Sequence, residues 1–551
     1  MPLAVPTARD FFPLLPELTL LFAGVVVLAI PIFSPRKNIL VSAIAATVGI
    51  LAALAALAWT WPVAMHQSPT LFGGLLLIDP FSWCVRLLLI FFTGIVLALW
   101  FTDSHDKFLA RSQAGDAPEF FLLLLMALLG MCLMASTTNL LMMFIAIEMA
   151  SLPSYVLAGF RKTQRLGAEA AMKYVLFGAA SAAVMAYGMS LLYGLFGTLD
   201  LRLIGHAIAA DPASLTGSHG LLFALGITGL LAGVGFKVAM VPMHFWCPDV
   251  FQGASIDVTT FLSVASKAAG LALLMRIGVA LAPVPWFSTL LLTIGIITCF
   301  WGNLAAYPQM DIKRLLAWSS VAHAGYMLIG MSALTSGGPL VAGAGAQDLI
   351  MSSGAELLLF YLFLYVFMNG GAFVTAAAIA QRLTGPTGAG MSIGVSAMVP
   401  APAALVSPDV GSGEDLRHYA GLMRRAPILA ATMLVCLLSL TGIPLTVGFA
   451  TKVKLFAVLL NTGSAAAWVG VAAVGINTVI AAFYYFRVIR QMYLTPSEAP
   501  PLIEIAPVTV VAVVLASLNV LLFVGYGWVE YGAASHAWLL GVPLIPAGAG
   551  G

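Results

Sequence analysis

Long apolar stretches separated by short polar connectors occupy nearly the whole chain. A helix needs about 20 consecutive apolar residues to cross the hydrocarbon core of a bilayer. This pattern predicts an all-α polytopic membrane protein with about fourteen transmembrane helices. The predicted spans are 15–34, 39–61, 81–102, 118–136, 138–158, 170–196, 221–241, 254–281, 286–306, 315–335, 354–380, 427–449, 466–488 and 506–530.

Basic residues in the connectors set the orientation, because cytoplasmic loops carry an excess of Lys and Arg. With the connector at 35–38 placed inside, only Arg9 and Arg202 fall outside. The pattern therefore predicts a multi-pass protein of a bacterial inner membrane, with both termini on the periplasmic side. The inside residues are then Arg36, Lys37, Lys107, Arg111, Arg161, Lys162, Arg165, Lys313, Arg314, Arg382, Arg417, Arg424, Arg425, Arg487 and Arg490.

The composition agrees with a membrane protein and gives no sign of a redox centre. The 551 residues are 61% hydrophobic and 8% charged, whereas soluble proteins carry about 25% charged residues. The net charge of +2 does not indicate a nucleic-acid partner. The five cysteines lie far apart and form no CxxC pair. Zinc and iron–sulfur sites need clustered ligands, so we expect no metal or redox cofactor in this chain.

A few ionisable residues interrupt the apolar spans. Glu148, Lys237, Lys267 and Lys452 each stand within such a stretch. A charge at the bilayer centre costs about 2.5–3.5 kcal/mol even on the lenient insertion scale, and such residues usually face a partner or a water-filled path. Lys173, near the inner end of the following span, is positioned to face Glu148. One acid and several lysines without a redox centre point to the movement of ions.

Two of these lysines stand beside predicted helix breaks. Lys237 follows two glycines in LLAGVGFK and precedes Pro242, and Lys452 follows Gly448 in TVGFATKVKLF. Backbone groups freed by such breaks are tolerated at membrane depth only against protein or water. Lys454 points to another side of its helix, because two residues rotate a helix by about 200°. Both lysines cannot face one path, and we favour Lys452 because its spacing from Gly448–Phe449 better matches that of Lys237 from Gly235–Phe236.

Two histidines and two arginines within or next to the spans have either a relay role or a structural one. His323 lies within a span and could relay protons, since its reference pKa is near neutral, although buried histidines are more often structural. His244 lies at a span boundary and is favoured less. Arg86 and Arg276 are interpreted as anchors at span ends or as members of structural ion pairs, because arginine stays protonated.

Short motifs recur at a distance of five spans. The segment 235–237 (GFK) is echoed by 448–452 (GFATK), and 155–159 (YVLAG) by 326–330 (YMLIG). An odd number of spans reverses the direction of the helix, so these echoes predict two inverted five-helix repeats with two broken helices. The predicted divisions are helices 1–3 at 1–117, the first repeat at 118–281, the second repeat at 282–492 with an inside loop at 383–426, and the last helix and tail at 493–551.

These stretches resemble the antiporter-like subunits of respiratory complex I (NADH:quinone oxidoreductase), and specifically subunit N, the ND2-type member. The segment PMHFWCPDVFQGA (242–254) discriminates best, since it is similar to the subunit N pattern PDVYQGA. Subunit M and the Mrp antiporters typically have PDAH there. The other similar stretches are 147–162, 169–194, 259–276, 302–330 and 437–456.

The resemblance implies an antiporter-like fold and proton translocation driven by quinone reduction elsewhere in the complex. It implies no cofactor in this subunit, and NADH, FMN, iron–sulfur clusters and quinone in partner subunits. The implied partners are the bilayer and other membrane subunits of complex I, both antiporter-like and small. The implied proton relay consists of Glu148, Lys173, Lys237, Lys267 and Lys452, with His323 as a possible further member.

Departures from the family pattern leave alternatives open. Ser255–Ile256–Asp257 replaces an Ala-Pro-rich run, and Asp257 could add a proton-uptake acid on the inner side. GFATKVK replaces the usual GFxGKF, so Lys454 competes with Lys452 as the exit lysine. The other classes are an Mrp-type cation/proton antiporter or related hydrogenase-complex subunit, and a scaffold whose buried charges only fix packing. The PDVF sequence disfavours the antiporter, and the two helix breaks disfavour the scaffold.

Overall fold

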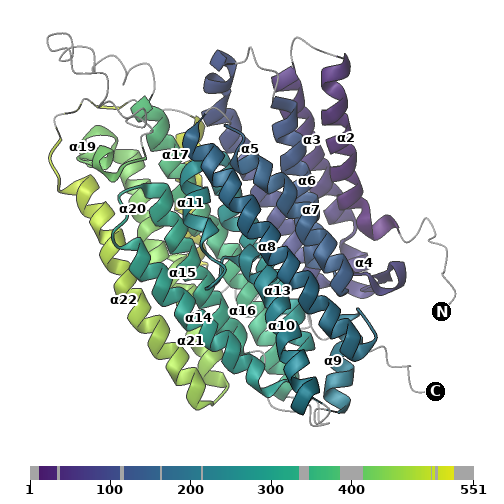
Figure 1. Cartoon of the computed structure of the whole chain (residues 1–551). Coiled ribbons are helices and arrows are strands. Elements are labelled where there is room, and N and C mark those ends of the chain that lie inside the picture. The colour runs from purple at the N-terminus through teal and green to yellow at the C-terminus, as the bar shows by residue number, and fades with distance from the viewer. Residues whose placement is uncertain are drawn as a thin grey trace.

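The fold is known from a computed structural model, which describes residues 11–33, 38–111, 117–161, 164–211, 215–333, 346–384, 414–497, 499, 501–502 and 507–525. Helices make up most of this part of the chain (Figure 1). The α-helices are α2 (Leu15–Phe33), α3 (Asn38–Trp59), α4 (Trp61–His66), α5 (Pro80–Arg111), α6 (Ala117–Ser136), α7 (Leu140–Ala158), α8 (Arg165–Phe196), α9 (Leu201–Ala210), α10 (Gly217–Val238), α11 (Trp246–Gly253), α12 (Ile256–Phe261), α13 (Lys267–Ala280), α14 (Pro285–Ala306), α15 (Ile312–Ser332), α16 (Ala346–Tyr365), α17 (Gly371–Thr384), α19 (Leu422–Arg425), α20 (Pro427–Thr441), α21 (Val447–Asn461), α22 (Ala465–Tyr493) and α23 (Pro507–Val524).

Shorter elements join or interrupt these helices. Two π-helical segments, η4 (Leu262–Ser266) and η6 (Val366–Gly370), make α12–α13 and α16–α17 continuous spans. The strands β1 (Thr70–Leu71) and β2 (Leu76–Leu77) form a small antiparallel hairpin. The remaining short helices are η1 (Phe12–Leu14), η2 (Phe72–Gly74) and η8 (Leu416–Tyr419).

The prediction of a polytopic helical protein is confirmed. Within the described residues, 12 helices are long and apolar enough to cross a membrane, and each corresponds to a predicted span. The two other predicted spans are also present. The span 315–335 is α15, a continuous helix that carries many polar side chains, and the span 427–449 is α20 followed by a break.

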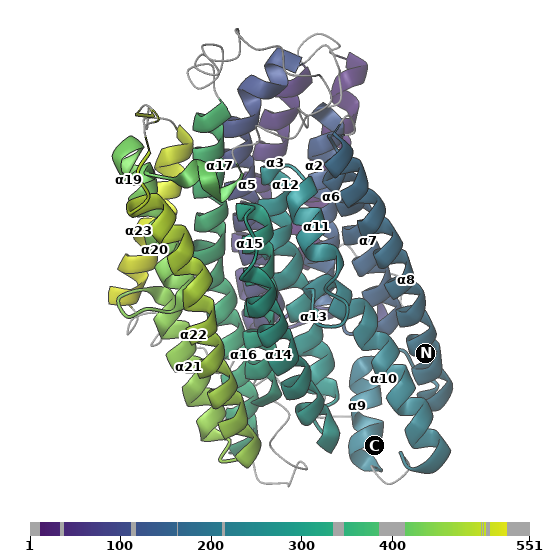
Figure 2. The same cartoon turned by 60° about the vertical axis from the view of Figure 1, so that its left-hand side comes forward.

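The helices run side by side in one bundle (Figures 1 and 2). In Figure 2, α7, α8 and α10 lie on one side and α20, α21 and α22 on the other, with α13, α15 and α16 between them. The most apolar part of the span 256–280 is completely buried, whereas the outer helices α8 and α22 expose most of theirs. Buried helices at membrane depth must satisfy their polar groups within the protein. Polar side chains at the centre of the bundle therefore contact one another.

The first helix break follows Lys237. Helix α10 ends at Val238, and Ala239 adopts a left-handed conformation with φ 64°. The Met240 N–H donates to the Gly235 carbonyl at 2.9 Å, which closes the end of the helix as in a Schellman motif. Lys237 therefore lies in the last turn of a half-helix, and α11 resumes the span at Trp246.

The second break precedes Lys452. Helix α20 ends at Thr441, Gly442 has φ 85°, and α21 begins at Val447. The two broken helices are thus confirmed. The motifs GFK and GFATK do not occupy equivalent positions. Gly235–Phe236 precede the first break, whereas Gly448–Phe449 follow the second. The physical reason is that the left-handed residue, not the GF pair, marks each break. The repeat boundaries stay a prediction.

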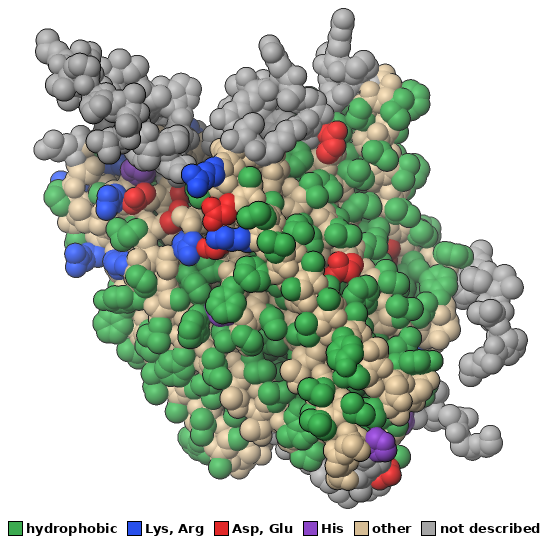
Figure 3. All heavy atoms as spheres, viewed as in Figure 1, with side chains coloured by type: hydrophobic (Ala, Val, Ile, Leu, Met, Phe, Trp, Pro, Cys, Tyr) green, Lys and Arg blue, Asp and Glu red, His purple; other side chains and the backbone are tan. Residues whose placement is uncertain are grey.

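Basic side chains gather at the upper end of the bundle in Figure 3. Of the predicted inside residues, Arg36, Lys37 and Lys162 and the side chains of Lys107 and Arg111 lie outside the described part, as does most of the loop 383–426 and both chain ends. The described end of that loop is anchored to the start of α15. The Ile312 N–H donates to the Glu414 carbonyl at 2.9 Å, and Lys313, 3% exposed, pairs with the Glu414 carboxylate at 2.8 Å.

The two buried arginines form ion pairs at a distance from the helix breaks. Arg276 makes two bonds of 2.6 Å to the Asp79 carboxylate, and Arg86 lies 3.1 Å from Glu17. A planar guanidinium suits such fixed pairs. The interpretation of both arginines as structural partners is therefore confirmed.

Candidate functional site

The first part of the site joins α7 to the end of α10. The Lys237 side chain is fully buried, and its Nζ donates to Ser151 Oγ at 3.2 Å. Ser151 stands one helical turn after the half-buried Glu148 on α7, and Lys237 is the charged neighbour that attracts this carboxylate. The structure therefore brings the acid together with the lysine at the first break, whereas the sequence had suggested Lys173 as the partner of Glu148.

Lys173 lies elsewhere. Its ion pairs are with Glu169 and Asp249, each at 2.7 Å, rather than with Glu148. Its side chain is 33% exposed. The expectation that it faces Glu148 is wrong, because Lys173 stands on the turn of α8 that packs against the start of α11. Asp249 also binds Arg314 at 2.7 Å, and these side chains line a polar cleft of about 280 Å³.

The second buried lysine of the site, Lys267, follows the π-helical segment η4. Lys267 is 1% exposed and donates from Nζ to the Ser320 hydroxyl on α15. Gly270, one turn further on, packs against the first lysine, since an added Cβ would lie 3.3 Å from the Lys237 Cβ. Helices α10 and α13 thus approach closely through this glycine, which lies one turn after Lys267 and against the backbone of Lys237.

One face of α15 continues the line. Ser320, His323 and Tyr326 recur at intervals of three residues, which places them along one side of the helix. His323 is 3% exposed and its Nδ1 is 2.8 Å from the Tyr361 hydroxyl. The imidazole lies within electrostatic reach of both Lys267 and Lys452. His323, left open by the sequence, therefore stands between the two lysines.

Lys452 closes the line at the second break. Its Nζ donates to the Thr441 carbonyl at 2.6 Å and to Thr478 Oγ1 at 3.0 Å, and lies 5.2 Å from the centre of the Tyr326 ring. The break frees the Thr441 carbonyl at the end of α20, so the irregular backbone itself supplies an acceptor for the lysine. Lys452 is 4% exposed.

Lys454 has a different partner. It forms an ion pair of 2.5 Å with Glu356 on α16. Sequence reasoning missed Glu356, because it stands only two residues inside the predicted span 354–380 and was not counted as a central acid. A glutamate within an apolar helix was the available signal. The two lysines of α21 therefore face different groups, as their rotation around the helix predicted.

The remaining candidates do not join the line. His244 is 1% exposed and packs among the rings of Phe245, Trp301 and Trp318. Asp257 is buried in the first turn of α12. In the described part of the chain no group of three or more His, Cys, Asp or Glu side chains could hold a metal ion. The side chains described above form a row of proton donors and acceptors: Lys237, Lys267, Ser320, His323, Tyr326 and Lys452.

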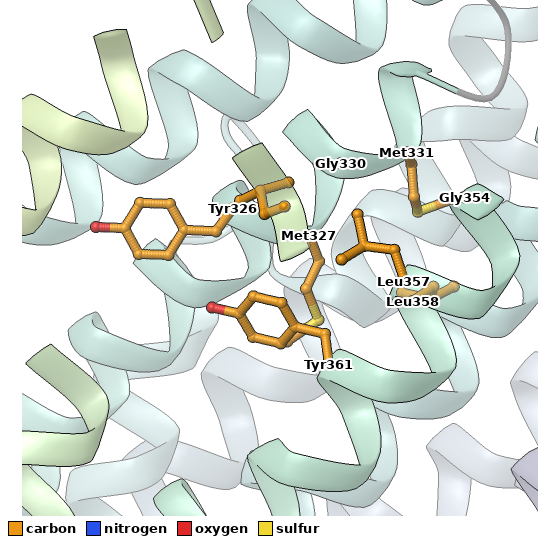
Figure 4. A pocket seen from close by; sticks show the side chains of 9 residues that line it. Tyr326, Met327, Gly330, Met331, Gly354, Leu357, Leu358 and Tyr361 are labelled. Atoms are coloured by element: carbon orange, nitrogen blue, oxygen red, sulfur yellow. The ribbon is translucent and has the colours of Figure 1, made fainter. Parts of the chain in front are cut away.

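A small cavity lies beside the row. It has a volume of about 10 Å³ and lies between α15, α16 and α21 (Figure 4), which is close to the least space that holds one water. The rings of Tyr326 and Tyr361 line one side, and Met331 and Leu357 lie beyond them. The cavity is mostly apolar and borders the last turns of α15.

Gly442 links the backbone of the second break to Lys452. An added Cβ would lie 2.8 Å from Lys452 Cδ and 3.0 Å from its Nζ. We expect Gly442→Ala to destabilise the protein by about 1–2 kcal/mol, the cost of a left-handed L-residue, and to displace the Lys452 side chain. Thermal unfolding of the purified protein measures the loss of stability. Gly475→Ala on α22, where a Cβ meets open space, is the control, and equal behaviour of the two variants would contradict this role.

Comparison with known proteins identifies the fold and its relatives. Residues 137–481 match the family described as NADH:quinone oxidoreductase/Mrp antiporter, transmembrane region. The chain is 36% identical over 498 residues to NADH-quinone oxidoreductase subunit N 2 of Sorangium cellulosum, covering 88% of each chain.

Solved structures agree. A chain of respiratory complex I from Thermus thermophilus with bound aureothin superposes with a TM-score of 0.69 and 30% identity, over 93% of this chain and 97% of that chain. A chain of the Mrp complex from Dietzia sp. DQ12-45-1b superposes with a TM-score of 0.71 and 19% identity, over 98% of both chains. At that identity the second likeness indicates the fold alone.

Proposed function

The chain belongs to the NADH-quinone oxidoreductase subunit N family, and from this premise we propose that protons cross it along Glu148, Lys237, Lys267, His323 and Lys452. It is an antiporter-like, proton-translocating membrane subunit of complex I. The observation that carries the proposed path is the position of His323 between Lys267 and Lys452, on the face of α15 whose Ser320 already binds the first of them.

Protons move along the path by transfer between titratable side chains. An amine, an imidazole and a carboxyl each exchange a proton with a neighbour or a bridging water. Ser320 and Tyr326 are donors and acceptors that connect the basic groups. Moving a charge next to one lysine changes the electrostatic balance at the next, because little water screens charges inside the bundle.

Lys173 has a separate place in this proposal. With Asp249 and Arg314 it lines the polar cleft between α8, α11 and α15. We assign it to the uptake side, where it holds α11 against α8. Helix α11 carries Phe251, whose ring centre is 5.7 Å from the Lys267 Nζ, so this contact supports the position of the central lysine.

The wider assignments follow from the family. The chain is a multi-pass protein of a prokaryotic membrane and part of respiratory complex I. We propose the bacterial inner membrane, periplasmic termini, and contacts with both antiporter-like and small membrane subunits. NADH, FMN, iron–sulfur clusters and quinone are then bound by partner subunits. The divisions 118–281 and 282–492 are proposed as the two inverted repeats, each with one of the two broken helices.

Glu148→Gln tests the proposed path, because it keeps the size of the side chain and removes its charge. We expect proton pumping by the assembled complex in liposomes to fall by about tenfold or more, in line with loss of a positioned proton-transfer group. Glu119→Gln, at the exposed start of α6, is the matched control. Pumping at the parental rate in Glu148→Gln would favour a purely structural carboxyl.

A further inference from the structure

The ion pair between Glu356 and Lys454 is not a member of the proposed proton path. Its atoms are 2.5 Å apart, and the side chains are 17% and 8% exposed. The Lys454 ammonium also lies 4.8 Å from the centre of the Phe360 ring. Removing both charges from water costs several kcal/mol per ion, so a buried pair is a poor device for stability alone. This cost points to another role for the pair.

The pair stands on the same two helices as the end of the proton path. Glu356 precedes Tyr361 on α16, and Tyr361 is the partner of His323. Lys454 follows Lys452 on α21 by two residues. Both helices that hold the ion pair therefore also hold the last members of the row.

The small cavity lies between the row and the ion pair. Tyr326 and Tyr361 line it on the side of the row, and Leu357 and Leu455 are the chain neighbours of Glu356 and Lys454. Met331, in the last turn of α15, also lines it (Figure 4). An apolar constriction passes ions only while it is hydrated. The cavity therefore lies on the side of the row toward the end of the bundle at which α15 and α21 finish, and it has room for about one water.

We propose that Glu356 is the proton acceptor on the outer side of the path and that Lys454 holds its carboxylate until the proton arrives. This inference rests on the proposed function. The Lys452 ammonium gives up one proton through water and becomes a neutral amine. The Glu356 carboxylate takes that proton and becomes a neutral acid, which ends its ion pair with Lys454. Release of the proton to the outer aqueous phase restores the carboxylate and the pair, and Lys452 is reprotonated from the side of His323.

Variants of the complete complex in liposomes test this assignment. Glu356→Gln and the double variant Glu356→Leu with Lys454→Leu should both pump about tenfold more slowly or worse, since both remove the acceptor. The double variant leaves no unpaired charge, so it separates proton transfer from ion-pair stability. Glu17→Leu with Arg86→Leu removes a comparable buried pair far from the path and should pump at the parental rate.

Two further variants sharpen the roles. Lys454→Arg should keep pumping, because a permanent cation can still hold the carboxylate. Glu356→Asp should retain part of the pumping lost in Glu356→Gln. If the assembled double variant pumps at the parental rate while Lys267→Ala does not, the pair is structural and this proposal is overturned, while the proposed path stands. If Lys267→Ala also pumps normally, the proposed path itself fails. Loss of pumping in Lys454→Arg would overturn the holding role.

Discussion

Lys267→Ala is expected to reduce proton pumping by the assembled complex by about tenfold or more, since a positioned proton-transfer group contributes roughly 100-fold or more to a rate. The lysine is 1% exposed, donates to Ser320 and stands one turn before Gly270, which packs against Lys237. Removal of its amine interrupts the row at its centre, and no other described basic side chain bridges Lys237 and His323. Electron transfer that is coupled to pumping should slow as well.

Lys267→Arg separates proton transfer from charge. Arginine keeps the positive charge and hydrogen-bonding capacity but does not release its proton. We therefore expect Lys267→Arg to fail in pumping almost as completely as Lys267→Ala. Ser263→Ala, one turn before Lys267 and bonded only to the Thr260 carbonyl among its described contacts, is the neighbouring control and should behave as the parent. Recovery of pumping in Lys267→Arg would indicate that the charge is needed only for packing or electrostatic bias.

Lys452→Met is the second substitution for which we expect a large loss of proton pumping. Methionine fills a similar space without a titratable group, so we expect a loss of about tenfold or more in the pumping rate. Lys454 should not replace it, because it faces Glu356 on another side of α21. Thr478→Val removes one of the two described hydrogen-bond acceptors of Lys452 and leaves the Thr441 carbonyl. A neutral hydrogen bond contributes about 1 kcal/mol, so this variant should show a mild loss.

The measurement is the rate of acidification of the liposome interior per unit of NADH oxidation. A parental rate in Lys452→Met together with a large loss in Thr478→Val would contradict the assignment, because the bond matters only through the lysine. The preference for Lys452 over Lys454 as a member of the row rests on this comparison.

The sequence was sufficient for the membrane spans and for the lysines of the row. Span lengths follow from the thickness of the bilayer, and a lysine such as Lys267 is conspicuous in an apolar segment. The position of a helix break was harder to predict. The motifs around Lys237 and Lys452 indicated that both helices are broken, but not where. The first break follows Lys237, at Ala239, and the second precedes Lys452, at Gly442. These left-handed residues depend on local backbone hydrogen bonds, which the motifs do not specify.

Side-chain partners were the part that sequence reasoning could not supply. Lys173 was assigned to Glu148, but its direction on α8 brings it to Asp249 on a neighbouring element. Glu356 and Lys454 are 98 residues apart, and only the packing of α16 on α21 joins them. Ser320 and Tyr326 gave little signal, because neutral polar residues are common in buried spans. Their spacing of three residues on either side of His323 was the pattern that could have revealed them.

The number of protons moved per NADH oxidised is the measurement that tests the central claim most directly. It should be determined for the parent complex and for Lys267→Ala, in liposomes, with the subunit composition of both verified. The account predicts that the fully assembled variant moves fewer protons per NADH than the parent, or oxidises NADH only at the correspondingly reduced rate. An assembled Lys267→Ala complex with both the parental ratio and the parental rate would contradict a proton path through this row of side chains.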